Sequence, residues 1–162
     1  MVPICDYVDD IIVDLRYASI NNMLGKKIAL ATEPLINSAC AAALTGAAAT
    51  FGLAGYKLVI WDAYRSAETH QALLGHTIDR RYVRLDSNHL TGRAVDITLA
   101  DTAGNYLDMG TDFDDFTDLA HTGAIGLTKT QLGNRELLKT SMETAGFTAW
   151  PYEWWHFDYL TQ

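Results

Sequence analysis

The sequence predicts a single α+β domain with a mostly antiparallel central sheet flanked by helices. The chain has 162 residues, which is the size of one domain with one hydrophobic core. Segments typical of strands and of helices do not alternate in regular β–α–β units, and this favours an antiparallel over a parallel sheet. No repeat, low-complexity tract or Pro/Gly/Ser-rich linker divides the chain. We therefore expect residues 1–162 to form one domain.

The first half of the chain supplies one long helix, one strand and one short helix. Residues 34–52, PLINSACAAALTGAAATFG, are rich in alanine and predict a helix with Pro34 in its first turn. Residues 56–64, YKLVIWDAY, are apolar and β-rich, so they predict a central strand. Residues 66–74, SAETHQALL, predict a short helix that the side chain of Ser66 caps.

The second half supplies the remaining elements. Residues 94–101, AVDITLAD, predict a second strand, and the turn TAGNY leads into a third short strand that ends near Met109. Residues 130–146 repeat apolar positions at helical spacing, starting at Leu132, and predict a second long helix. Residues 153–160, EWWHFDYL, are too aromatic and too short for a convincing helix, so they predict a terminal strand.

Composition excludes several classes of protein. The net charge is −8, and because phosphate binding needs a basic face, nucleic acid is not an expected partner. No apolar run approaches the roughly 18 residues of a membrane span, so no membrane association is expected. The first ten residues lack the basic and apolar regions of a secretory signal. This favours the cytoplasm, with the periplasm as the alternative.

The two cysteines do not indicate a site. Cys5 and Cys40 lie far apart and outside any CxxC pattern, so we expect neither a disulfide framework nor a thiolate zinc site. The acidic residues that follow the predicted third strand lack the loop pattern of a calcium site and predict a solvated face. We expect His70 and His76 to lie on the exposed side of the short helix.

An aspartate inside an apolar strand is the first sign of a functional site. Asp96 interrupts AVDITLAD, and a carboxylate in such surroundings must be paired or bound to a metal. His89 and His156 lie on or beside predicted strands. Two imidazoles and one carboxylate are the ligand set of a catalytic zinc site that keeps its fourth position open for water. For each residue taken singly, an ordinary core or surface role is the alternative.

Two further residues have the chemistry of a hydrolytic site. Glu153 lies three residues before His156 in the aromatic segment EWWHF. Aromatic walls exclude water and can raise the pKa of a carboxylate enough for it to act as a general base. Arg65 directly follows the predicted central strand and stays charged at every physiological pH. A structural ion pair with Asp62, three positions earlier, is the alternative for Arg65.

These motifs resemble those of a known family. SNHLTGRAVDIT (87–98) matches the SxHxxGxAxD element, and EWWH the ExxH element, of the zinc D,D-peptidases, whose fold is shared with the Hedgehog amino-terminal domain. Further segments are similar to the VanX-type D-alanyl-D-alanine dipeptidases and follow in order over nearly the whole chain. They are VDLRYASINNMLG (13–25), DAYR (62–65), DMGTDFDDFTDLAH (108–121), NRELLKTSMETAGF (134–147) and EWWHF (153–157).

The resemblance implies roles for individual residues. It implies that His89, Asp96 and His156 bind one zinc ion per chain. It further implies that Glu153 is the catalytic base and that Arg65 stabilises the transition state.

The resemblance also extends to residues around these five. Asp114 would meet the amino group of the substrate, and Ser87, the first residue of the SxHxxGxAxD element, is also expected to bind substrate. Asp62 and His121 are expected to orient site residues. For His121 a purely structural role is the alternative.

The expected activity is the zinc-dependent hydrolysis of D-Ala-D-Ala and similar D,D-dipeptides to free amino acids. The partner is then a small dipeptide, while the oligomeric state stays open. One alternative is a D,D-carboxypeptidase or a peptidoglycan endopeptidase of the same superfamily. Another is a zinc-stabilised binding domain without catalysis, which would need neither Glu153 nor Arg65. Only 23 residues separate Arg65 from His89, fewer than we expect in the vancomycin-resistance enzymes, and this leaves the enclosure of the site open.

Overall fold

A five-stranded sheet forms the centre of the molecule, for which a computed structural model describes residues 1–77 and 79–160. The strand order is β2-β4-β5-β7-β6. Its strands are β2 (Ile12–Val13), β4 (Tyr56–Asp62), β5 (Ala94–Asp101), β6 (Thr148–Ala149) and β7 (His156–Asp158). β2 runs parallel to β4, and the other neighbours are antiparallel. The predicted α+β class with a mostly antiparallel sheet is confirmed.

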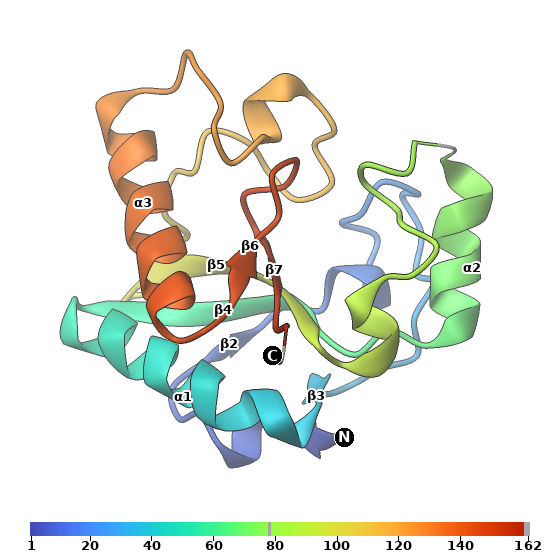
Figure 1. Cartoon of the computed structure of the whole chain (residues 1–162), viewed down its shortest axis with the longest axis horizontal. Coiled ribbons are helices and arrows are strands. Elements are labelled where there is room, and N and C mark those ends of the chain that lie inside the picture. Colours follow the sequence, from blue (N-terminus) through green and yellow to red (C-terminus); the bar gives the residue numbers. More distant parts are fainter. Residues whose placement is uncertain (78, 161–162) are drawn as a thin grey trace.

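Three helices and a separate strand pair surround this sheet (Figure 1). The helices are α1 (Ser38–Leu53), α2 (Ala67–His76) and α3 (Lys129–Thr144), and the pair consists of β1 (Val2–Pro3) and β3 (Leu35–Ile36). α1 packs against β4 and α3, whereas α2 lies at the opposite side of the view. Single 3-10 turns lie at η1 (Ile4–Asp6), η2 (Arg16–Ala18), η3 (Asn88–Thr91) and η4 (Asp118–Ala120). None of the helices in the described ranges has the length and apolar composition needed to cross a membrane.

The start of the first long helix differs from the prediction. α1 begins at Ser38, because Leu35–Ile36 stays extended to pair with Val2–Pro3. The side chain of Asn37 then accepts a hydrogen bond from the backbone N–H of Ala39 and caps the helix. Pro34 therefore precedes a strand and is not part of the helix.

The predicted third strand is wrong. Among residues 102–117, all of which the structure describes, strand pairing is limited to one isolated bridge, between Tyr106 and Ala100. The side chain of Asp108 accepts a hydrogen bond from the backbone N–H of Gly110 at 2.9 Å, and Gly110 has a φ of 88°. This turn begins two residues after the bridge at Tyr106, so the pairing with β5 does not extend into a strand.

The later elements agree with the prediction in position but not in every detail. α3 lies where it was predicted and buries Leu138 and Met142, but Leu132 is 49% exposed because it lies on the outer face. The terminal strand is shorter than predicted: only His156–Asp158 pairs with the sheet, and the residues before it form a turn.

Strand register brings three polar side chains together. Asp62 of β4 lies opposite Asp96 of β5, and Asp96 lies opposite His156 of β7. Residues directly opposite each other on antiparallel strands have neighbouring side chains. A register shift between Ile60 and Asp62 adjusts the end of β4. The site is thus built across the three central strands of the sheet.

Candidate active site

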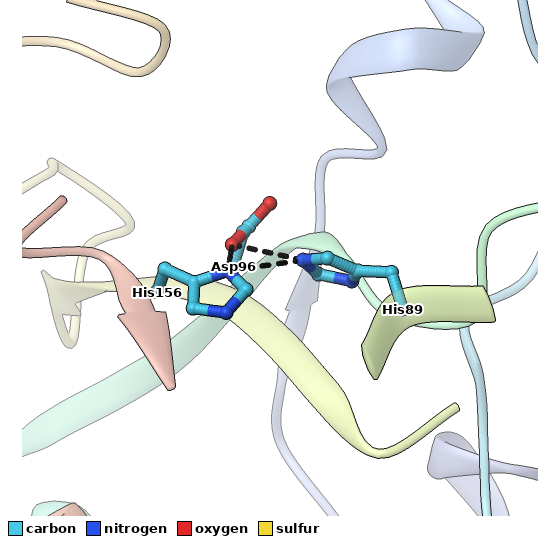
Figure 2. A group of neighbouring side chains, drawn as sticks. All are labelled: His89, Asp96 and His156. Atoms are coloured by element: carbon cyan, nitrogen blue, oxygen red, sulfur yellow. Dashed lines mark hydrogen bonds and ion pairs between the residues drawn. The ribbon is translucent and has the colours of Figure 1, made fainter. Parts of the chain in front are cut away.

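His89, Asp96 and His156 form one compact buried cluster (Figure 2). His89 Nε2 lies 3.2 Å from Asp96 Oδ1 and 3.2 Å from His156 Nδ1. His156 Nδ1 lies 2.9 Å from Asp96 Oδ1. The three side chains come from η3, β5 and β7, and none of the three residues is more than 6% exposed.

The cluster fits a metal ion by distance. Two ligand atoms about 2.0–2.1 Å from a tetrahedral metal are roughly 3.3 Å apart. The observed separations of 2.9–3.2 Å are close to this value. A small concerted movement of the side chains would therefore suffice to hold one ion.

The outer hydrogen bonds of the histidines show which ring nitrogens face the cluster. His89 Nδ1 lies 2.6 Å from the carbonyl oxygen of Ala63, so this nitrogen carries the proton and donates. His156 Nε2 lies 3.0 Å from Asp158 Oδ1 and donates in the same way. When His156 is neutral, the inward atoms of His89, Asp96 and His156 are all electron-pair donors. Three converging donors call for positive charge between them, and the group could hold a metal ion that supplies this charge.

The ionisation of the cluster follows from the same geometry. Burial raises the pKa of Asp96, but the neighbouring His89 and His156 outweigh it, and the pKa of Asp96 lies below its ordinary value. Burial lowers the pKa of His156, but its hydrogen bonds to Asp158 and Asp96 outweigh burial and raise that pKa to about 10. Both pKa shifts favour a negatively charged Asp96 beside a positively charged His156, so the cluster stabilises positive charge.

A glycine lets His89 reach the cluster. Gly92, with a φ of 66°, ends η3 between His89 and Asp96. A Cβ atom at this position would lie 2.9 Å from the backbone nitrogen of Asn37, which donates a hydrogen bond to the carbonyl oxygen of Gly92. Only glycine combines this backbone conformation with so close an approach.

Glu153 lies beside the cluster in the turn before β7. Its Oε2 is 4.0 Å from His156 Nδ1, and the residue is 7% exposed. Burial, together with the negative charges of Asp96 and Asp114, raises the pKa of Glu153 well above its ordinary value, although His156 opposes this. A buried carboxylate with a raised pKa beside the cluster is a candidate general base.

Arg65 lines the same cavity as Glu153 and is held by two carboxylates. Its Nε donates to Asp62 Oδ2 at 2.7 Å, and its Nη2 lies 3.5 Å from Asp96 Oδ2. Burial opposes the charge of Arg65, but Asp62 and the other neighbouring anionic groups outweigh it, so the pKa stays above its ordinary value. The ion pair between Arg65 and Asp62, which the sequence offered as an alternative, is present, and it fixes the guanidinium beside the cluster.

Asp114 differs from the exposed acids around it. Its Oδ1 accepts from the Tyr17 hydroxyl at 3.1 Å and its Oδ2 from the backbone N–H of Met23 at 2.9 Å. Burial raises the pKa of Asp114 to about 7. The residue has a φ of 58° and lines the same cavity as Glu153 and Arg65. Asp114 is thus a desolvated carboxylate facing the cavity.

The segment between Arg65 and His89 covers this cavity despite its shortness. Ser87, which is 7% exposed, Tyr82 and Arg84 contribute to the lining. The Tyr82 ring stacks on Phe116 with a centroid distance of 4.4 Å. The enclosed space is about 20 Å³, roughly the volume of one water molecule.

One of the three remaining histidines, His70, differs from its prediction. His70 is 2% exposed, and its Nε2 donates to the carbonyl oxygen of Arg84 at 2.9 Å, so the predicted surface position is wrong. It lies three residues before the buried Leu73 and shares its face of α2. His76 is exposed as predicted. His121 contacts Tyr82 through its ring and, among the described residues, none of the three clustered side chains.

Several residues at the site were not predicted. Tyr17 holds Asp114 and lies under the guanidinium of Arg65, 4.9 Å from ring centroid to Cζ. Trp150 lines the cavity and donates from Nε1 to the carbonyl oxygen of Arg81. Asp158 holds the outer nitrogen of His156. A polar residue two positions from a ligand on the same strand was the available signal for Asp158, because alternate residues share a face.

Comparison with known proteins identifies the relatives of this chain. A family model described as D-ala-D-ala dipeptidase matches residues 1–162. A D-alanyl-D-alanine dipeptidase of Escherichia coli (strain K12) is 36% identical over 152 residues, which cover 92% of this chain and 79% of that protein. Similar dipeptidases of Enterococcus faecalis (strain ATCC 700802 / V583) and Enterococcus faecium are 29% and 30% identical. They align with 92% and 89% of this chain, and with 86% and 83% of their own lengths.

Proposed function

The chain belongs to the D-Ala-D-Ala dipeptidase family of metallopeptidases, and we propose that it hydrolyses D-Ala-D-Ala and similar D,D-dipeptides to free amino acids with one zinc ion per chain. The observation that carries the proposal is the convergence of three electron-pair donors within 3.2 Å of one another. Beside them lie a buried carboxylate and a buried guanidinium.

His89, Asp96 and His156 would hold the metal. Two imidazoles and one carboxylate suit zinc and leave a fourth position open. When bound, the ion would lower the pKa of a water molecule and polarise the peptide carbonyl.

Glu153 would move the protons of the reaction. As a carboxylate it takes a proton from the attacking water, and as an acid it returns this proton to the departing amine. Its raised pKa suits both steps, since a base whose pKa lies nearer the working pH is also the better acid in the second step.

Arg65 would stabilise the oxyanion that develops on the scissile carbonyl. Its Nε is committed to Asp62, so the guanidinium is oriented before substrate arrives. A preorganised donor of this kind contributes about 3–4 kcal/mol when it behaves like a single oxyanion-hole group.

Asp114 and Ser87 would recognise the substrate. Asp114 is positioned to pair with a free ammonium group, because it is partly desolvated and faces the cavity. A buried carboxylate that would pair with the free amino group of the substrate favours a dipeptide over a long peptide, which has no free amino group next to the scissile bond. This supports the dipeptidase over a carboxypeptidase or endopeptidase acting on peptidoglycan.

A comparison of three substrates tests the proposal. The zinc-loaded protein is incubated with D-Ala-D-Ala, L-Ala-L-Ala and a peptidoglycan stem pentapeptide, and released amino acids are separated and quantified. We expect D-alanine from D-Ala-D-Ala alone, and none with the variant Glu153→Gln. Comparable release from the pentapeptide would replace the dipeptidase with a carboxypeptidase, and no release from any substrate would indicate a binding domain.

A further inference from the structure

Asp158 connects a clustered histidine to the wall of the cavity. We propose that Asp158 is a positioning residue that fixes the ring of His156, and that Arg84 holds Asp158 in place from the cavity wall. The inference rests on the proposed metal centre. It adds a residue pair that acts through His156 and contacts neither substrate nor metal.

The two carboxylate oxygens of Asp158 have separate partners. Oδ1 accepts from His156 Nε2 at 3.0 Å, and Oδ2 accepts from Arg84 Nη2 at 3.2 Å. Asp158 is 5% exposed and lies in β7, where its backbone pairs with Ala94 of β5. With one oxygen bound on each side and the backbone held in the sheet, the carboxylate cannot rotate without losing one partner.

Arg84 is itself anchored at two points besides Asp158. Its guanidinium lies over the Trp150 ring, 4.3 Å from Cζ to the ring centroid. Its carbonyl oxygen accepts the hydrogen bond from His70 Nε2 at 2.9 Å. A chain of contacts therefore runs from α2 through the cavity wall to His156. The short segment between Arg65 and His89 is fastened to the cluster by this chain.

The hydrogen bond from His156 to Asp158 decides which ring nitrogen can bind a metal. While Nε2–H donates outward, the electron pair of Nδ1 points toward His89 and Asp96, as Figure 2 shows for the inward nitrogen. Without Asp158, the proton can move to Nδ1 and the ring can turn, and both changes remove the ligand atom.

Metal binding gives a direct test that does not depend on hydrolysis. Zinc affinity is measured by competition with a chelator for wild type, Asp158→Ala, Asp158→Asn and Arg84→Ala. Cobalt-loaded samples report the geometry at the metal through their visible absorption. We expect Asp158→Ala to bind zinc 10- to 100-fold more weakly, as is usual when a partner of a metal-bound histidine is lost, with an altered cobalt spectrum.

Asp158→Asn and Arg84→Ala should weaken zinc binding less than Asp158→Ala does. Asp158→Asn can still accept from His156 through its amide oxygen but then presents its NH₂ group to Arg84, so its loss should be smaller. Arg84→Ala should weaken binding least of the three. Arg81→Ala is the matched control: Arg81 lies in the same segment, forms a 2.7 Å ion pair with Asp79 and touches aromatic rings. It should bind zinc as wild type does.

The outcomes separate this inference from the proposed function. Wild-type zinc affinity and cobalt spectrum in a folded Asp158→Ala variant would overturn it. If that variant lacks the far-UV circular dichroism of the wild type, Asp158→Asn and Arg84→Ala decide, and wild-type affinity in both would overturn it. A wild-type protein that binds zinc but does not cleave D-Ala-D-Ala would refute the dipeptidase and leave the role of Asp158 standing. A protein that binds no zinc would refute both.

Discussion

Replacing Asp114 with asparagine should abolish recognition of the substrate's amino group without disturbing the fold. Asparagine tolerates the left-handed backbone conformation that Asp114 adopts, with a φ of 58°. Its amide oxygen can still accept one of the hydrogen bonds that Tyr17 and Met23 donate. The variant therefore removes the negative charge and leaves the shape nearly unchanged.

The size of the effect follows from the surroundings of Asp114. Leaving one member of a buried charge pair without its partner costs roughly 2–5 kcal/mol. This corresponds to a reduction of about 30- to 5000-fold in kcat/KM, at 1.36 kcal/mol for each factor of ten. D-Ala-D-Ala should therefore outperform its N-acetylated form by this factor in the wild type. In Asp114→Asn the advantage should nearly vanish, chiefly through the slower reaction of the free dipeptide.

The pH dependence of the same ratio gives an independent check. Asp114 must be ionised to pair with an ammonium, and its pKa is raised to about 7. Below pH 7 the ratio of free to capped kcat/KM should fall as Asp114 gains a proton. Above about pH 8 it should fall again, because the α-amino group of the substrate loses its proton. Groups that act on both substrates cancel in the ratio.

Kinetics with the two substrates from pH 5.5 to 9 would decide the matter, with Asp118→Asn as control. The side chain of Asp118 is 97% exposed, so its replacement should leave the ratio unchanged. A ratio near one in the wild type, or an unchanged ratio in Asp114→Asn, would refute the role of Asp114.

The remaining predictions concern the metal, the base and the guanidinium. His89→Ala, Asp96→Ala and His156→Ala should each bind less than one equivalent of zinc by elemental analysis, and full zinc in all three would refute the ligand assignment. Glu153→Gln should retain zinc but lower kcat by about 10²- to 10⁴-fold, so near wild-type turnover would exclude Glu153 as the base. Arg65→Lys should also reduce kcat/KM strongly, because an ammonium cannot donate to Asp62 and to an oxyanion in the manner of the forked guanidinium. Removing zinc with a chelator should lower the thermal unfolding midpoint, because free zinc at 100 times its Kd adds about 2.7 kcal/mol to the free energy of unfolding. An unchanged midpoint would contradict zinc binding to the folded state.

Local patterns predicted most of the fold. β5 has the predicted bounds, and Ser66 caps α2, because apolar runs and capping side chains act within a few residues. The start of α1 could not be predicted in this way. It depends on pairing between Leu35–Ile36 and Val2–Pro3, which lie more than thirty positions apart. The sequence around Pro34 gives no sign of this pairing.

The residue types of the candidate site were predictable from the sequence. The residues that hold the site residues in place were not. An aspartate such as Asp96 in an apolar strand is visible in the sequence because its charge needs compensation. The contributions of Asp158, Tyr17 and the buried His70 depend on the direction in which side chains point. That direction is set by strand register and by the path of the cavity wall, and both are properties of the folded chain.

A zinc titration of the metal-free protein tests the central claim most directly. Portions of zinc are added to a known amount of protein, and the rate of D-alanine release from D-Ala-D-Ala is measured after each addition. We expect no release without metal, a linear rise with added zinc, and a plateau at one equivalent per chain. Release that is independent of zinc, or no release at a full equivalent of bound zinc, would contradict a dipeptidase centred on His89, Asp96 and His156.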